Sequence, residues 1–486
     1  MIELHLPWLL LTVLTPLIGA ASVFGLKDHE AVRQRAILAL ATTLGFALAA
    51  WADFALLKTS TAHDRWDVLG QIAGRPVFQI DTLSGPLLPL GALLYLLTAL
   101  ATPRTKIRRF SFAWNLVSAS ILLATFCCHS PGELVLLLSL GTIPPLVELR
   151  DRQRPTSVFA IHMGLFVALI ASGWWLTRYA QAEVSGAGAL LLLAGVLLRS
   201  GIAPVHSWMT DLFEHATFGT ALLFVTPMVG AYAAVHLVLP IAPGWVIRSL
   251  AIASIITSIY AAAMASVQKE ARRFFCYIVL SHSSLILIGL ETATPVGLTG
   301  SLTVWLSDAL ALAGFGLTLR SVEARIGRVS LANYHGMYEH TPTLATFFLL
   351  TGLASVGFPG AFGFVGSELL VDGAVEAYPF VGTAVVLIGA LNGIAVMRAY
   401  FRLFTGVRHA SSISLKIGAA ERVAVMILTV LIIGGGLFPQ RLITSRYRAA
   451  AEIVETRALR FSPSEDELHS NEVVATDRAE VIRIPD

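Results

Sequence analysis

Apolar segments follow one another along almost the whole chain, and short polar connections separate them. A helix that crosses the hydrocarbon core of a bilayer needs about 20 apolar residues. About fourteen segments meet this need, near residues 6–26, 34–57, 84–103, 109–128, 131–148, 156–177, 187–203, 217–240, 245–267, 273–291, 296–319, 342–372, 380–405 and 421–438. The pattern predicts an all-α, polytopic membrane protein whose transmembrane domain covers residues 1–440.

The composition agrees with this prediction. Of the 486 residues, 56% are hydrophobic and 13% are charged, whereas a soluble domain carries about 25% charged residues. The net charge of +3 says little about nucleic acid, because the cations fall in short loops. The cysteines Cys127, Cys128 and Cys276 lack the spacing of zinc or iron–sulfur ligands. No G-x-G-x-x-G motif opens a βαβ unit, so we expect no cofactor, no metal and no nucleic-acid partner.

Lysine and arginine concentrate in alternate loops, and loops of this kind face the cytoplasm. The richer set carries Lys27, Arg33, Arg35, Arg104, Lys106, Arg108, Arg109, Arg150, Arg152, Arg154, Lys269, Arg272, Arg273, Arg320, Arg325, Arg328, Arg408, Lys416 and Arg422. With an even number of spans, both termini are expected on the outer side of the cell's inner (plasma) membrane. Residues 441–486 form a polar tail. Arginines among apolar residues predict a short interfacial helix at 441–460, and the acidic segment 461–486 is expected to be disordered.

The most informative stretch is 189–219, where an apolar segment meets charge. Arg199 stands inside a predicted span, and a charge at the bilayer centre costs roughly 2.5–3.5 kcal/mol. Gly201 and Pro204 follow, and because proline has no N–H, a carbonyl near Ser200 loses its helical partner. Backbone freed in this way needs a protein or water partner, so the break predicts a water-lined route. Further candidates for a proton or ion pathway are His206, Asp211, Glu214 and His215.

Arg199 also has a purely structural interpretation, as a cation paired with one carboxylate. A buried cation calls for a counter-charge, and the candidate partners are Glu148, Asp211, Glu214 and Asp308. Glu148 lies just beyond Pro144 and Pro145, which break or kink the fifth segment. It is either a pathway carboxylate inside the membrane or the first loop residue, paired with Arg150.

The second half of the chain holds its own titratable residues inside apolar spans. His282 lies between serines, and Asp308 lies near the middle of the next span. Histidine exchanges a proton near neutral pH, and a carboxylate at this depth needs a partner or water. The twelfth segment is interrupted at Pro359 and Gly360 and continues to Glu368. We expect His282 and Asp308 to point into the bundle, linked directly or by water, with Glu368 on the same hydrated axis; the alternative is that backbone groups and serine hydroxyls satisfy each of them separately.

Several motifs, in this order, resemble the antiporter-like subunits of respiratory complex I: FQIDTLSGP, RSGIAPVHSWMTDLFEHATFG, SVQKEARRFFCYIVLSH and LASVGFPGAFGFVGSELL. The chain is most similar to the M-type subunit, and it also resembles relatives in Mrp sodium/proton antiporters and membrane-bound hydrogenases. The resemblance implies two inverted five-helix repeats, at about 109–240 and 245–405, with broken helices 7 and 12. It also implies proton translocation along a central hydrated axis.

The resemblance includes departures from the family's pattern. Ser139 stands where the family has the proton-handling glutamate of helix five, and Arg199 and Met228 replace the lysines of helices seven and eight. Asp308 replaces the histidine of helix eleven, and Ser367, next to Glu368, occupies the ionisable position of helix twelve. Arginine stays protonated at essentially any pH, so we expect Arg199 to be a fixed charge in the route and not a proton carrier.

These observations predict a proton- or cation-translocating membrane subunit of a multisubunit, energy-coupled complex that resembles complex I. The chain shows no redox or hydrolytic motif of its own, so the driving reaction is assigned to membrane or soluble partner subunits. The rewritten relay leaves two alternatives open. One is the membrane subunit of a two-component inorganic-carbon-accumulating transporter with a soluble, zinc-containing, carbonic-anhydrase-like partner. The other is a stand-alone cation/proton antiporter.

Overall fold

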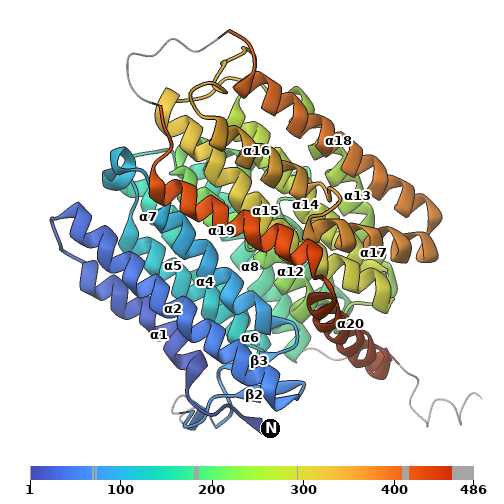
Figure 1. Ribbon diagram of the computed structural model, residues 1–486. Coiled ribbons are helices and arrows are strands. Elements are labelled where there is room, and N and C mark those ends of the chain that lie inside the picture. Colours follow the sequence, from blue (N-terminus) through green and yellow to red (C-terminus); the bar gives the residue numbers. More distant parts are fainter. Residues whose placement is uncertain are drawn as a thin grey trace, which may run out of the picture.

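The computed structural model describes residues 2–67, 70–71, 74–179, 185–292, 294–407 and 415–461. The acidic segment 462–486, which we expect to be disordered, lies outside the described residues, as does Arg408. Within them the chain folds into a bundle of helices that run roughly side by side (Figure 1). The helices are α1 (Trp8–Val23), α2 (His29–Leu57), α4 (Ser84–Leu100), η1 (Arg104–Arg109), α5 (Phe112–Cys127), α6 (Pro131–Leu140), α7 (Ile143–Asp151), α8 (Ser157–Tyr179), α9 (Ser185–Ser200), α10 (Ser207–His215), α11 (Phe218–Val225), α12 (Val229–Ala233), η3 (Ala234–Val238), α13 (Gly244–Val267), α14 (Ala271–Glu291), α15 (Pro295–Ile326), α16 (Pro342–Ser355), α17 (Phe362–Ala377), α18 (Pro379–Phe404), α19 (Ala419–Leu437) and α20 (Gln440–Phe461).

Many of these helices are built to lie in a bilayer. Within the described part of the chain, nine segments are long and apolar enough to cross a membrane, and further apolar helices such as α1, α4 and α5 are shorter. The chain is therefore a multi-pass membrane protein. The number of fourteen spans stays a prediction, because these segments are defined by length and composition alone.

Both helix breaks predicted near Pro204 and Pro359 are present. The seventh span ends as α9 at Ser200 and resumes as α10, and the twelfth ends as α16 at Ser355 and resumes as α17. The same glycine cap ends both first halves. Gly201 and Gly357 have φ of 76° and 79°, a conformation that glycine adopts without a steric penalty. Each cap closes with the hydrogen-bond pattern of a Schellman motif, Ile202 N–H to Leu197 O in one and Phe358 N–H to Leu353 O in the other.

The fifth and eighth spans are interrupted as well. Pro144 and Pro145 stand in the first turn of α7, where a missing N–H leaves no bond unmade. The break in the eighth span, between α11 and α12, was not predicted. Met228 there adopts a left-handed conformation, with φ of 52°, and the helix then continues into η3, a turn of π-helix that contains His236.

A small sheet corrects the all-α prediction. The strands are β1 (Ile2–Glu3), β2 (Thr61–His63) and β3 (Gln79–Asp81), with β1 parallel and β3 antiparallel to the central β2. Strands of two or three residues are too short to show an alternating apolar pattern. The sheet lies at the end of the bundle that carries the N-terminus (Figure 1).

The predicted interfacial helix is α20, and it packs across this same end of the bundle (Figure 1). Two of its arginines are held by backbone carbonyl groups. Arg446 is buried and donates to Leu83 O and Thr82 O, and Arg457 donates to Leu239 O and Ala242 O. These two basic residues therefore have protein partners, although they stand at the end that we expect to face outward.

Helix α15 is the buried helix of the second half, and glycines set how closely α17 approaches it. A Cβ atom on Gly300 would lie 2.3 Å from the backbone N of Leu370, and one on Gly373 would lie 2.2 Å from the Cα of Gly297. Small residues of this kind let helix backbones pack closely in membranes. This contact fixes the position of α15, on which Asp308 lies.

We expect Gly300→Ala to lower the free energy of unfolding by about 1–3 kcal/mol, the usual cost of overpacking. The added methyl group would meet the backbone of α17, which cannot move aside as a side chain can. The measurement is the thermal unfolding midpoint of the purified protein in detergent. The matched control is Gly389→Ala on α18, where an added methyl group meets no atom within 4 Å. Equal midpoints for the two variants would contradict the role of Gly300.

Candidate functional site

The predicted pair of His282 and Asp308 is present in the core. His282 Nδ1 lies 2.9 Å from Asp308 Oδ2, and the two residues are 2% and 1% exposed. They come from neighbouring helices, α14 and α15. The other ring nitrogen of His282, Nε2, is buried and has no hydrogen-bond partner among the described residues. The histidine can therefore accept one further hydrogen bond while Asp308 holds its ring.

Polar side chains from four helices surround this pair. Next to His282, the hydroxyl of Ser281 accepts a hydrogen bond of 2.9 Å from Asn392 Nδ2, and Ser258 donates to Ser281 O. Next to Asp308, a Cβ atom on Gly363 would lie 2.6 Å from Ser307 Oγ. Because Gly363 lies in the first turn of α17, the break in the twelfth span lies beside Ser307, the residue before Asp308.

Arg199 is buried but does not pair with a carboxylate. Its guanidinium donates a 3.0 Å hydrogen bond to Phe224 O and stacks on the Phe224 ring at 3.9 Å, with Trp208 at 5.7 Å. Phe224 lies in the last turn of α11, which ends at Val225. Met228 N–H donates to Val225 O and not to Phe224 O. The C-terminal end of a helix carries partial negative charge, and the ring faces add cation–π attraction. The helix end therefore takes the place of the predicted carboxylate.

The carboxylates predicted to pair with Arg199 all have other partners. Glu148 bonds to Thr217 and Thr220 at the start of α11 and lies 3.5 Å from Arg152 Nη1. Asp211 lies 3.1 Å from His215 Nδ1, and Glu214 lies 2.8 Å from Arg273 Nη2. The prediction of an Arg199 ion pair was wrong because it treated each charge alone and left out the carbonyl groups that an unpredicted helix break releases.

Two small cavities lie beside Arg199. One, of about 30 Å³, is lined by Tyr95, Ser118 and Arg199, and the other, of about 20 Å³, by Arg199, Ser200 and Ser283. Each exceeds the roughly 10–15 Å³ that one water molecule needs. Ser283 donates a 3.3 Å hydrogen bond to Ser200 O. This oxygen lies where Pro204 was predicted to leave a carbonyl group without its helical partner. Ser283 is the residue after His282, so this cavity lies one residue along α14 from the His282–Asp308 pair, and we call Arg199, Ser283 and this pair the polar chain.

The remaining predicted residues lie away from this polar chain. His206 is half-buried, with its ring centroid 5.4 Å from that of Tyr260. Glu214 and His215 line a separate cavity among basic residues. Glu368 is exposed on α17, which contradicts the expectation that it faces the interior. The reason is helical phase, because Gly366 and Leu370 are on the buried face of α17 and a residue two positions after Gly366 points to the opposite side.

A second titratable cluster was missed in the sequence. Asp81 Oδ2 lies 2.7 Å from His129 Nε2, and the His129 ring centroid lies 5.4 Å from that of His236. The cluster borders a cavity of about 360 Å³ beneath α20. The signals were Asp81, which stands just before an apolar helix within the motif FQIDTLSGP, and His129, which stands between two spans. Within the described chain, no group of three or more His, Cys, Asp or Glu residues is placed to hold a metal ion.

Charge coupling shifts both groups of the Asp81–His129 pair, which lies outside the spans. Burial alone would raise the pKa of Asp81, but His129 holds it well below its usual range. Burial would lower the pKa of His129, but the Asp81 carboxylate holds it above the ordinary value. The pair therefore favours the charged form of both side chains.

We expect Arg199→Met to lower the free energy of unfolding by about 1–3 kcal/mol, because it leaves one carbonyl unpaired. Arg272→Met should cost more, about 3–5 kcal/mol, because it removes the guanidinium that pairs with Glu323. The measurement is denaturant unfolding of both variants in detergent. A larger loss for Arg199→Met would show that Arg199 neutralises a charge after all.

We expect His129→Gln to destabilise the protein more at about pH 6 than at about pH 9. A histidine with a raised folded pKa gives its full stabilisation below the unfolded value, about 6.5, and loses it as the pH rises through the folded value. The measurement is the difference in unfolding midpoint between wild type and variant at the two pH values. The control is His29→Gln, at an exposed position at the start of α2. A difference that does not change with pH would contradict the charged pair.

Comparison with known proteins agrees with this arrangement. A family model described as "NADH:quinone oxidoreductase/Mrp antiporter, TM" matches residues 162–392. The NAD(P)H-quinone oxidoreductase chain 4 of Synechococcus sp. (strain WH7803) is 26% identical, over 94% of this chain and 91% of that protein. The NADH-quinone oxidoreductase subunit M of Rickettsia conorii is 29% identical, over 41% of this chain and 42% of its own length.

Solved structures show the same fold. A chain of respiratory complex I from Thermus thermophilus superposes with a TM-score of 0.78 at 20% identity, over 92% of this chain and 99% of that one. A chain of the Mrp complex from Dietzia sp. DQ12-45-1b superposes with a TM-score of 0.80 at 18% identity, over 93% of this chain and 98% of that one. The match to the family model and the curated relatives together show that this chain belongs to the family of antiporter-like membrane subunits that is shared by complex I and the Mrp antiporters.

Proposed function

We propose that the chain is a proton- or cation-translocating membrane subunit of a multisubunit, energy-coupled complex. The observation that carries this proposal is the buried His282–Asp308 pair, together with a water-sized cavity that is lined by Arg199 and by Ser283, the residue after His282. Ionisable residues inside membrane spans usually mark ion or proton pathways. The relatives named as quinone oxidoreductase subunits support a role within a larger complex.

The side chains suit a division of roles. His282 is the proton carrier, because its Nε2 is open to a water or a proton and because histidine titrates near neutral pH. Asp308 supplies the counter-charge that an imidazolium needs at this depth. Arg199 is the fixed charge, since a guanidinium keeps its proton and the helix end holds it in place.

We also propose that the two halves, at about 109–240 and 245–405, are inverted repeats related by an approximate two-fold axis in the membrane plane. The support is the glycine cap at Gly201 and Gly357, each followed by a proline and then by a second helix. Transporters with such repeats place their ion route at the breaks. The same scheme puts the arginine-rich end of the bundle in the cytoplasm and both termini on the outer side of the plasma membrane.

A second candidate is the membrane subunit of a two-component inorganic-carbon-accumulating transporter. Ser139 favours it, because this residue stands at the position of the family's helix-five glutamate and its hydroxyl only bonds back to Val135 O. A relay without that glutamate departs from the relatives that couple to quinone. Purification of the tagged chain from its own cell distinguishes these candidates. Quinone oxidoreductase subunits would support the first, a carbonic-anhydrase-like partner would support the second, and the absence of any partner would favour a stand-alone antiporter.

We expect Asp308→Asn and His282→Gln to reduce proton flux by at least about tenfold, because positioned proton carriers contribute factors of roughly 10² or more. The measurement is the decay of a pH gradient in membrane vesicles that hold the whole complex and whose wild type conducts. The control is Asp372→Asn, a carboxylate on the exposed side of α17. Wild-type flux in both core variants would rule out this route.

A further inference from the structure

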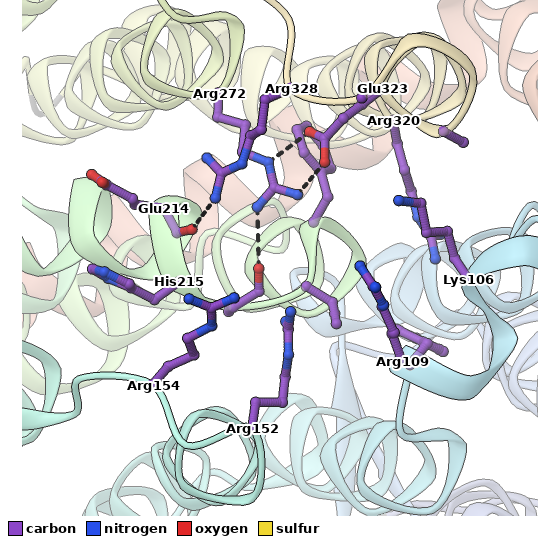
Figure 2. Close-up of a pocket in the computed structure, with 16 residues that line it drawn as sticks. Lys106, Arg109, Arg152, Arg154, Glu214, His215, Arg272, Arg320, Glu323 and Arg328 are labelled. Carbon is purple, nitrogen blue, oxygen red and sulfur yellow. Dashed lines mark hydrogen bonds and ion pairs between the residues drawn. The ribbon is translucent and has the colours of Figure 1, made fainter.

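A cavity of about 290 Å³ lies at the arginine-rich end of the bundle, apart from the polar chain (Figure 2). We call it the basic cavity. Lysine and arginine outnumber carboxylates in its lining. The cationic side chains are Lys106, Arg109, Arg152, Arg154, Arg272, Arg320 and Arg328, and the carboxylates are Glu214 and Glu323. These residues come from connections far apart in the sequence, so the fold gathers charges that the chain keeps separate.

The two lining carboxylates pair with only one of the lining cations. Glu323 is paired with Arg272, whose Nε lies 2.6 Å from Glu323 Oε2. The carboxylate of Glu214 pairs with Arg273, which does not line the cavity. Figure 2 shows the Glu214 side chain extending away from the cavity, while its backbone oxygen accepts from Arg328 at 2.5 Å. Both carboxylates are therefore committed to partners.

Two of the cations that face the cavity have no protein counter-charge among the described residues. Arg109, Arg152 and Arg154 project toward its centre in Figure 2. The side chains of Arg109 and Arg154, both exposed, make no hydrogen bond or ion pair with the described residues, whereas Arg152 Nη1 lies 3.5 Å from Glu148 Oε1. Burial lowers the pKa of the Arg152 guanidinium, Glu148 opposes this shift, and Arg154 adds to it. Like charges held this close repel one another, and an anion between them removes the repulsion.

The directions of the guanidinium groups suit a tetrahedral oxyanion. Arg320 and Lys106 approach from one side, Arg152 and Arg154 from another, and Arg328 from a third (Figure 2). A carboxylate is planar and is satisfied by one arginine fork, whereas a phosphate offers oxygens in several directions at once. Arginine is also the preferred residue for phosphate recognition, and basic pockets between membrane helices bind phosphate-bearing lipid head groups.

We propose that the basic cavity is a binding site for a phosphate group, carried either by soluble phosphate or by the head group of an anionic lipid. The bound phosphate bridges η1, the α7–α8 connection and the end of α15. It thereby fastens the first half of the bundle to the helix that carries Asp308.

The test compares two double variants of the full chain. Arg109→Gln with Arg154→Gln removes two lining cations that hold no protein partner. Arg108→Gln with Arg150→Gln removes the same charge from η1 and from the last turn of α7, at positions that are exposed, as Arg109 and Arg154 are, but lie outside the lining. Inorganic phosphate is titrated by calorimetry in delipidated detergent solution. Phosphatidylglycerol and phosphatidylcholine are compared by native mass spectrometry from nanodiscs.

We expect the lining variant to bind at least about tenfold more weakly than wild type, since a hydrogen bond to a charged group is worth about 1.5–3 kcal/mol. The control variant should stay within about twofold. Phosphate binding by calorimetry identifies the soluble source, and retention of phosphatidylglycerol over phosphatidylcholine identifies the lipid source. Equal losses of affinity in both variants would show that overall charge alone causes the effect, and would overturn the proposal. The proposal is also overturned if the wild-type protein binds neither probe. That outcome includes the case in which an acidic partner peptide occupies the basic cavity instead.

Discussion

The organisation of this protein depends on one constraint, that backbone groups inside a bilayer must find partners within the protein or in trapped water. Each helix break releases such groups, and side chains from other helices meet them. Arg199 bonds to Phe224 O, Ser283 to Ser200 O and Trp305 to Pro227 O. The polar interior is therefore assembled around interrupted helices, and the same interruptions leave the small cavities that a proton route needs.

This constraint also explains how the chain tolerates arginine inside a span, at the position where the resemblance to the family's motif implies lysine. An ammonium group is a compact charge that changes protonation when its surroundings change, whereas a guanidinium is planar and lies flat on aromatic rings. The stack of Arg199 on Phe224, with Trp208 on a neighbouring helix, uses this shape. In the function proposed above, the first half of the bundle holds a permanent charge, and His282 and Asp308 in the second half exchange the proton.

The sequence was sufficient to predict most helices, both main breaks and the His282–Asp308 pair, because apolar length, Gly/Pro positions and buried charge are local signals. It was not sufficient where a partner depends on tertiary structure. The break at Met228 carries only Pro227 as a signal, and without that break Phe224 O could not be recognised as the partner of Arg199. The prediction that Glu368 faces the interior was wrong because the rotation of a helix after a break cannot be counted from the residues before the break. Asp81, His129 and His236 come together only when β3, the α5–α6 connection and η3 fold against one another.

The π-turn η3 has a consequence for comparing relatives. Such a turn holds one residue more than an α-helical turn at the same height, and here it ends the eighth span, because residues 239–241 form a turn and α13 begins at Gly244. His236 faces His129 from within this turn. An ungapped alignment of this chain with a relative whose eighth helix is regular would match the residues of this turn to side chains that point in other directions, by up to about 100° at its end. Inferences about equivalent positions here should be drawn from superposed coordinates, with a one-residue gap placed in 234–238.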